Sequence, residues 1–303
     1  MDELMLVERL RSEVPEDIDV TGAERRWRRG ALGGRPVRRR RPLLLSAVVA
    51  TAGAAALGVV VLDGPDTAPM ANVAAVLDQA ADTASGDPVP GPGQIVYQDT
   101  VERRRTGEGR WYRVRTETWL PAGGAGTGLI RQENSIKGAG LPPDGETAVG
   151  PCPAAAPIDR PYLGGVPADP DALLDLMNGM GEGGRGERLW NAASDLIDRP
   201  APPKVRAALF RAIADIPGVR LRDDGVDAAG RHGIAVTRVQ DGVRDEFLFD
   251  RATHRFLGTR TVVAEPGNGF GAPGTTVYAS ALIRTEIVDR APEPGPDAEP
   301  SGC

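Results

Sequence analysis

The chain has very little lysine, histidine or cysteine, with two residues of each among its 303. Arginine supplies the rest of the positive side-chain charge, which we attribute to coding bias and not to function. The two histidines, His232 and His254, fall in a predicted turn and a predicted hairpin. Neither has a catalytic partner nearby in the sequence, so both are interpreted as turn residues and not as acid–base catalysts or metal ligands.

The sequence also lacks the short motifs of the common enzyme classes. It contains no GxSxG, Walker A or HExxH segment, and no GxGxxG follows a predicted strand. The glycine-rich stretch at residues 179–186 lies between two predicted helices, without the strand that a phosphate loop needs. The carboxylate pairs Asp169/Asp171 and Asp223/Asp224 suit helix caps and solvated turns better than a cation site. We therefore expect no enzyme activity, no cofactor and no resident metal.

Charge and composition narrow the remaining classes. The net charge of −6 hides a slightly basic stretch at residues 1–41 and an acidic remainder. An acidic outer portion argues against nucleic acid as a partner. Glycine and proline, at 39 and 27 residues, fall short of the share expected of a fully disordered chain, so we expect a folded domain with irregular loops.

A single uncharged stretch of twenty residues, Leu43–Leu62, is the most informative feature of the chain. At about 1.5 Å per residue a helix of this length spans roughly 30 Å, the thickness of the hydrocarbon core of a bilayer. The sequence therefore predicts one transmembrane helix over residues 42–62, which makes the lipid bilayer a partner.

The flanks of this stretch predict its orientation, because excess arginine marks the cytoplasmic side of a membrane. The arginines that precede it are Arg38, Arg39, Arg40 and Arg41. We expect a single-pass protein of the cell membrane, with residues 1–41 cytoplasmic and residues 63–303 extracytoplasmic. A cleaved signal peptide is the alternative, but its apolar core would be shorter and its charged region would be briefer.

The cytoplasmic segment contains a short amphipathic pattern. Leu4, Val7 and Leu10 recur at helical spacing, and Pro15 ends the predicted helix. One interpretation is a docking site for a cytoplasmic protein, with these three side chains as its contacts. The other is a frayed leader that binds nothing, since so few apolar residues bury little area.

Two cysteines, Cys152 and Cys303, fall in the predicted extracytoplasmic portion, where disulfides persist. A bridge between them would close a very long loop, worth about 4–5 kcal/mol in the chain-entropy model. An even number of cysteines suggests the bridge but fixes no geometry, so two unpaired thiols are the favoured interpretation and the bridge is the alternative.

The extracytoplasmic portion has strand patterns that are segregated from helix patterns. Residues 63–93 predict a linker and a helix, and residues 94–290 predict an α+β domain. In that domain we expect three strands, an irregular loop at 137–166, three helices and five strands. Such an order favours a curved antiparallel sheet packed against helices. Residues 291–303 predict a disordered tail.

Two short segments predict turns between strands in the last third of the chain. Asp241-Gly242 separates two strand patterns and is a strong signal for a two-residue hairpin. The segment from Asp250 to Arg255 predicts a type I turn followed by a left-handed residue, which would be His254.

Tryptophan and charge share a face on one predicted strand. Trp111 and Trp119 lie on the same face of this strand, and Arg113, Arg115 and Glu117 lie between them on that face. Such a mixed face could line a groove. We favour partial burial under the middle helices, because aromatic side chains usually serve packing.

Several segments of the chain carry a resemblance to known proteins: AAVLDQAADTA, PGQIVYQDTVERR, PADPDALLDLM, ALFRAIADIPGVRLRDDGVDAAGRHGIAV and FLFDRATHRFLGTRTVV. With the arginine-rich stretch before an alanine-rich anchor, they resemble a family of actinobacterial single-pass membrane proteins. Genes of that family often lie beside one for an RNA polymerase sigma factor, which implies a regulatory role and a sigma factor as a cytoplasmic partner. No catalytic residues carry over.

The order of strands and helices is similar to the half-barrel of lipoprotein carriers and of periplasmic sigma-factor regulators. The zinc-binding His/Cys pattern of many anti-sigma domains is missing, because residues 1–41 contain neither residue. We expect a membrane-anchored extracytoplasmic sensor or regulator. The alternative is a carrier or scaffold for lipid or lipoprotein, with a hydrophobic ligand outside and an inert cytoplasmic tail.

Overall fold

The computed structural model describes residues 70–106, 109–123, 126–137, 144–151, 155–267 and 270–301. The chain divides into two units, Met1–Val60 and Val61–Cys303, and every described residue belongs to the second. No helix among the described residues is both long and apolar enough to cross a membrane. The predicted site residues lie outside the described residues: Leu4, Val7, Leu10, Arg38, Arg39, Arg40, Arg41, Cys152 and Cys303, together with the apolar stretch Leu43–Leu62.

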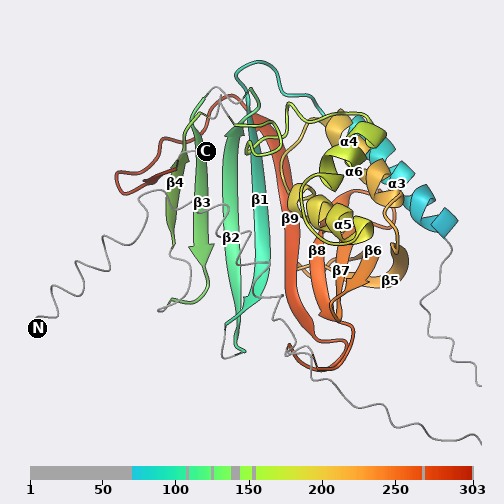
Figure 1. Cartoon of the computed structure of the whole chain (residues 1–303). Helices are drawn as coiled ribbons and strands as arrows, with labels where there is room; N and C mark the ends of the chain where they lie inside the picture. Colours follow the sequence, from blue (N-terminus) through green and yellow to red (C-terminus); the bar gives the residue numbers. More distant parts are fainter. Residues whose placement is uncertain are drawn as a thin grey trace, which may run out of the picture. The chain divides into compact units, whose positions relative to one another are not determined.

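Among the described residues, ten strands form one sheet, whose arrangement is seen in Figure 1. Neighbouring strands are antiparallel, except that β10 runs parallel to β4 at one edge. The predicted α+β class is confirmed by this sheet and by the four described helices. In sheet order the strands are β10 (Glu299–Ser301), β4 (Gly145–Val149), β3 (Gly128–Asn134), β2 (Trp111–Pro121), β1 (Ile95–Arg105), β9 (Thr276–Val288), β8 (Phe256–Val263), β7 (Val243–Phe249), β6 (His232–Gln240) and β5 (Arg220–Val226).

The first and last strand groups join at the centre of the sheet, where β1 pairs with β9. The register runs from Ile95↔Val288 to Arg103↔Ala279, with one irregularity beside Asp99. The last five strands therefore belong to the same sheet as β1, which carries Tyr97.

The two turns that the sequence predicts are present in the structure. Gln240 pairs with Val243, and the two residues between them have positive φ, 49° at Asp241 and 74° at Gly242. Two successive positive φ values match the twist of a two-residue hairpin, and glycine adopts them without steric cost. His254, with a φ of 55°, occupies the predicted left-handed position, and its N–H donates to the carbonyl of Asp250.

Four helices are described: α3 (Met70–Ser85), α4 (Pro170–Asn178), α5 (Arg185–Leu196) and α6 (Pro203–Ala214). Helix α4 begins as predicted, because an Asp169 oxygen accepts a 2.9 Å hydrogen bond from the N–H of Ala172 and Pro170 opens the first turn. Helix α6 is followed by Gly218, whose φ of 86° lies in the left-handed region that glycine adopts without steric cost.

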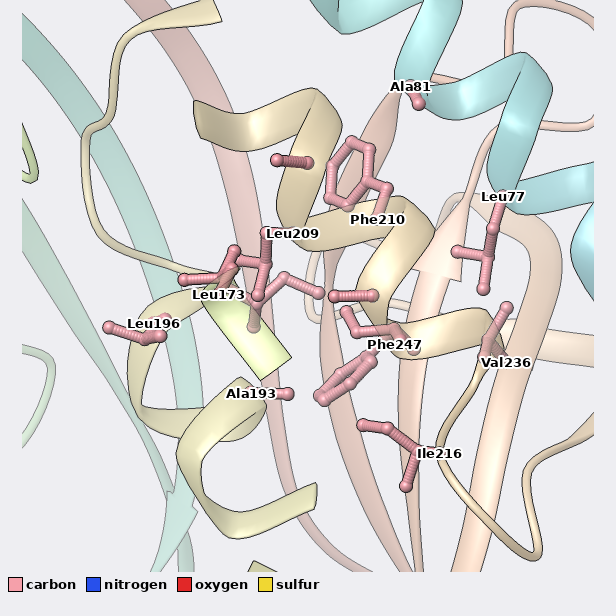
Figure 2. Close-up of a cluster of buried hydrophobic side chains, with 14 of the residues drawn as sticks. Leu77, Ala81, Leu173, Ala193, Leu196, Leu209, Phe210, Ile216, Val236 and Phe247 are labelled. Carbon is pink, nitrogen blue, oxygen red and sulfur yellow. The ribbon is translucent and has the colours of Figure 1, made fainter. Parts of the chain in front are cut away.

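The main core lies between the four helices and strands β5–β7 (Figure 1). Figure 2 shows Leu77 of α3, Phe210 of α6 and Phe247 of β7 pointing into this space. Trp190 of α5 is fully buried and stacks on Phe247 with ring centroids 4.2 Å apart. Since burying such a side chain contributes about 1.5–3 kcal/mol, this layer fixes the helices on one face of the sheet.

Two short strands differ from the sequence expectation. Strand β4 lies inside the stretch expected to be an irregular loop, and β10 lies in the expected disordered tail. Neither has enough alternating residues to be recognised alone. Strand β10 is hydrogen-bonded to β4, where Ser301 pairs with Val149. Strand β4 is also hydrogen-bonded to β3 on its other side.

Candidate functional site

Strand alternation shows which face of the sheet each side chain occupies, because cross-strand partners share a face. One row crosses five strands: Glu246 pairs with Arg260, Arg260 with Ala279, Ala279 with Arg103, and Arg103 with Arg113. Glu246 precedes Phe247, which faces the helices, so this row lies on the other side. We call the side of the sheet opposite α3–α6 the helix-free face.

Aromatic and charged residues gather on the helix-free face at strands β1–β3 and β9. We call this group the aromatic–arginine face. It comprises Tyr97, Asp99, Arg103, Arg105, Trp111, Arg113, Arg115, Glu117, Trp119, Arg131 and Arg284. The expectation that Trp111 and Trp119 pack under the middle helices is wrong. Their shared face was read correctly from the alternation, but long-range packing placed the helices on the other side.

Tyr97 lies at the centre of the aromatic–arginine face. Its hydroxyl donates a 2.7 Å hydrogen bond to Glu117, and its ring lies 5.0 Å from that of Trp119. The guanidinium of Arg284 lies 4.9 Å from the Tyr97 ring centroid. Burial, and then the bond to Glu117, raise the pKa of Tyr97, so the phenol stays protonated and serves as a donor.

Asp99 and Arg115 form the best-aligned ion pair of this face. The guanidinium is bidentate, with Nε 3.1 Å and Nη2 3.0 Å from the two carboxylate oxygens. This hydrogen bonding raises the pKa of Arg115. The Asp99 side chain is 9% exposed whereas that of Arg115 is 46% exposed, so the pair presents its cationic partner to solvent.

The C-terminal segment contacts the end of the aromatic–arginine face that contains Trp119 and Arg131. Arg131 lies 5.3 Å from the Trp119 ring and 2.7 Å from Glu146 of β4. The N–H of Gly295 also donates to Glu146, at 2.7 Å. This backbone bond, and then Arg131, lower the pKa of Glu146. Ala291 packs against the cluster that contains Trp119, so the last segment of the chain contacts this side of the face.

The opposite end of the face is formed by the β1–β2 hairpin. The guanidinium of Arg103 lies 5.2 Å from the Trp111 ring, and that of Arg105 lies 5.6 Å from it. Arg103, Arg105 and Arg113 are exposed, and no carboxylate among the described residues pairs with any of them. This end therefore carries uncompensated positive charge. Sequence reasoning missed Arg103 and Arg105, although the two-residue period of β1 could have placed them beside Trp111.

A separate crevice lies beneath the helices. It is lined mainly by apolar side chains, among them Leu173, Leu196 and Leu209, with Arg199 and Arg206 also in contact. Its volume is only about 10 Å³, which is the space of roughly one water-sized sphere. In this conformation it has no room for an acyl chain.

The candidate cation ligands of the sequence have structural partners. Asp169 caps α4, Asp223 pairs with Arg251 at 3.3 Å, and Asp224 pairs with Arg222 at 2.9 Å. Over the part of the chain that the structure describes, no group of His, Cys, Asp and Glu side chains could hold a metal ion.

No protein-family model matches the chain, and no curated protein sequence matches it. Solved structures similar to the chain include the following two. The MucA/MucB complex of Pseudomonas aeruginosa is 13% identical with a TM-score of 0.25, and the match covers 73% of this chain and 59% of that chain. A Vibrio parahaemolyticus domain named as an outer membrane lipoprotein-sorting protein is 10% identical with a TM-score of 0.24, and the match covers 73% and 96%. Likeness at these TM-scores carries no functional argument.

Proposed function

We propose that the chain is a membrane-anchored regulator or sensor of the cell membrane. Its extracytoplasmic unit binds a partner or ligand through the aromatic–arginine face, and residues 1–41 contact a cytoplasmic protein such as a sigma factor. The observation that supports this most is the set of exposed arginines stacked on tyrosine and tryptophan rings. These three residue types dominate the binding energy of protein interfaces.

The proposal includes no catalytic activity. It rests on the motifs that the sequence lacks and on how the carboxylates of the aromatic–arginine face are engaged. Asp99 is held by Arg115, while Glu117 accepts from Tyr97 and lies near Arg115 and Arg131. Both carboxylates are therefore already engaged by neighbouring side chains of the same face.

A carrier of lipid or lipoprotein is the second candidate, and the apolar crevice beneath the helices favours it. For this function the crevice would have to open well beyond its volume of about 10 Å³. That requires α4–α6 to separate, at the expense of contacts such as those of Leu173 and Leu209. We rank the carrier second because an opening of this size costs buried apolar area.

The regulator proposal is tested at the cytoplasmic segment. Replacing Leu4, Val7 and Leu10 together by Asp should abolish co-purification of the cytoplasmic partner, because apolar residues at helical spacing insert into a partner's groove. The control variant, Arg9→Asp with Ser12→Asp, has the same change in net charge but leaves the apolar stripe intact. Membrane insertion should persist in both. An unchanged set of partners in the triple variant would favour an inert tail and the carrier.

The extracytoplasmic half of the proposal is tested by site-specific crosslinking. A photo-crosslinking amino acid in place of Arg113, on the aromatic–arginine face, should give a discrete adduct with a partner in intact cells. The control position is Val89, which is 72% exposed and lies outside that face. Equal adducts from both positions, or none from Arg113, would count against this face as the binding surface.

A further inference from the structure

A cleft lies where the aromatic–arginine face meets strands β8 and β9. Its volume is about 310 Å³. The residues that line it are Arg103, Trp111, Val226, Asp227, Arg260, Thr275, Thr276 and Ala279. They come from the β1–β2 hairpin, the β5–β6 connection and strands β8–β9, which are distant in the sequence. The volume falls at the lower end of the range for small-molecule sites.

The wall of this cleft exists because the β5–β6 connection folds over the helix-free face. The β5–β6 register shifts between Arg222 and Gly225. A Cβ on Gly225 would lie 2.7 Å from a Leu248 methyl group, so a larger residue at this position would require Leu248 to move. The connection is then held by a 3.2 Å hydrogen bond from the N–H of Ala228 to the carbonyl of Ser280.

Arg103 contributes a positive charge to the lining of the cleft. Its cross-strand partner is Arg113, and like charges opposite each other destabilise a sheet unless something compensates them. The Trp111 ring beside the guanidinium restricts its motion, which lowers the entropy lost when an anion binds. Thr275 and Thr276 also belong to the lining.

The nearby carboxylates do not cancel this charge. Asp227 is bound by Arg231 at 2.6 Å and accepts N–H bonds from Ala229 and Arg231, and its side chain has no exposed surface. Glu246 is likewise unexposed and is shared by Arg244 and Arg260. Two guanidiniums around one carboxylate leave a further positive charge beside the cleft.

We propose that this cleft binds the phosphate group of a small molecule or lipid headgroup, with Arg103 as the principal contact. A guanidinium matches phosphate oxygens in a bidentate geometry, and the two threonine hydroxyls can donate to the same group. The inference goes beyond the regulator proposal and does not depend on any protein partner. It assigns the cleft a ligand chemistry that no sequence motif signals.

The test is calorimetric titration of the full chain in phosphatidylcholine nanodiscs with sn-glycerol 3-phosphate, with glycerol as the uncharged control. Arg103→Gln should weaken phosphate binding about tenfold, the effect of one lost charged hydrogen bond. Arg110→Gln removes the same charge from the hairpin turn, at an exposed residue outside the cleft lining, and should leave binding unchanged. Circular dichroism melting should confirm that both variants are folded.

A second titration with dihexanoyl phosphatidic acid distinguishes the two sources of phosphate. Tighter binding of this lipid that still depends on Arg103 would assign a lipid headgroup, whereas equal binding of both probes would assign a free phosphate monoester. Either result supports the proposal. It is overturned if neither probe binds, or if Arg103→Gln and Arg110→Gln weaken binding equally, since that would indicate only diffuse attraction.

Discussion

The guanidinium of Arg260 lies 2.6 Å from the carboxylate of Glu246, a side chain with no exposed surface. Arg244 approaches the other oxygen of the same carboxylate at 2.8 Å. The three side chains come from two adjacent strands and lie on the helix-free face. A buried carboxylate is tolerated there because two cations and their hydrogen bonds offset its lost hydration.

Replacing Glu246 by Gln should destabilise the protein strongly. The change leaves two largely buried guanidiniums without their counter-charge, and breaking a buried ion pair in this way typically costs about 3–5 kcal/mol. Urea unfolding followed by tryptophan fluorescence measures the loss. Glu286→Gln is the matched control, because Glu286 pairs with Arg284 in an exposed position and its loss should not move the midpoint. Equal shifts for the two variants would contradict the assignment.

Asp245→Asn should stabilise the protein at neutral pH. Burial raises the pKa of Asp245, despite the 2.7 Å hydrogen bond that the Thr261 hydroxyl donates to its carboxylate. Because the pKa is raised in the folded state, folding favours the protonated carboxyl. The resulting stability is fully present below the ordinary pKa of about 3.9, and it is lost as the pH rises through the folded-state pKa. The advantage of the Asn variant should therefore be largest at pH 7 and shrink toward pH 4.

Unfolding free energies of the Asp245 variant and the wild type across this pH range provide the measurement. Asp223→Asn is the control, because the Asp223 side chain is 87% exposed and its replacement should change the unfolding free energy little. A benefit of Asp245→Asn that grows on acidification would refute the stated cause.

Reporter fusions should place residue 20 inside the cell and residue 250 outside. The reason is the arginine cluster Arg38–Arg41 before the apolar stretch Leu43–Leu62, since positive charge is retained on the cytoplasmic side. Phosphatase and fluorescent-protein fusions at the two positions report the compartment. An exported reporter at residue 20, or a mature N-terminus near Ala71, would exclude this topology.

A disulfide between Cys152 and Cys303 is expected in the exported protein. Both cysteines lie outside the described residues, but Gly150 and Ser301 precede them by two positions each. The N–H of Gly150 donates to the carbonyl of Ser301 at 2.9 Å, so the chain positions that lead to the two sulfurs are adjacent.

Mass spectrometry of non-reduced peptides should find the linked pair, and reduction should lower the free energy of unfolding by up to about 5 kcal/mol. The Cys152→Ser/Cys303→Ser variant should show no further loss on reduction. Alkylation of both thiols in the intact exported chain would show that the bridge is absent.

Local features were predictable because a few neighbouring residues determine them. Asp241-Gly242 specifies its hairpin through backbone preference alone, and Asp169-Pro170 specifies a helix start through one side chain and one fixed φ. The alternation of Trp111 and Trp119 likewise gave their common face. None of these requires knowledge of the rest of the chain.

Long-range features were not predictable in this way. Strand β10 contains Pro300 and spans three residues, so only its pairing with β4 makes it a strand. The side of the sheet on which the helices pack decides whether Trp111 is covered by them, and alternation cannot supply that choice. The cleft beside Arg103 needs segments from three parts of the chain, so no sequence window contains it.

The pairing of β1 with β9 has a consequence for how the protein is made. Tyr97 and Arg284 lie side by side in the sheet yet are 187 residues apart in the chain. Strands β1 and β2 are synthesised early, whereas β9, which pairs with the other edge of β1, is synthesised near the end of the chain. Contacts of such separation slow folding, and an open strand edge invites pairing with other chains. Folding of the protein should therefore depend on a factor that covers the open edge of β1 until β9 has been synthesised.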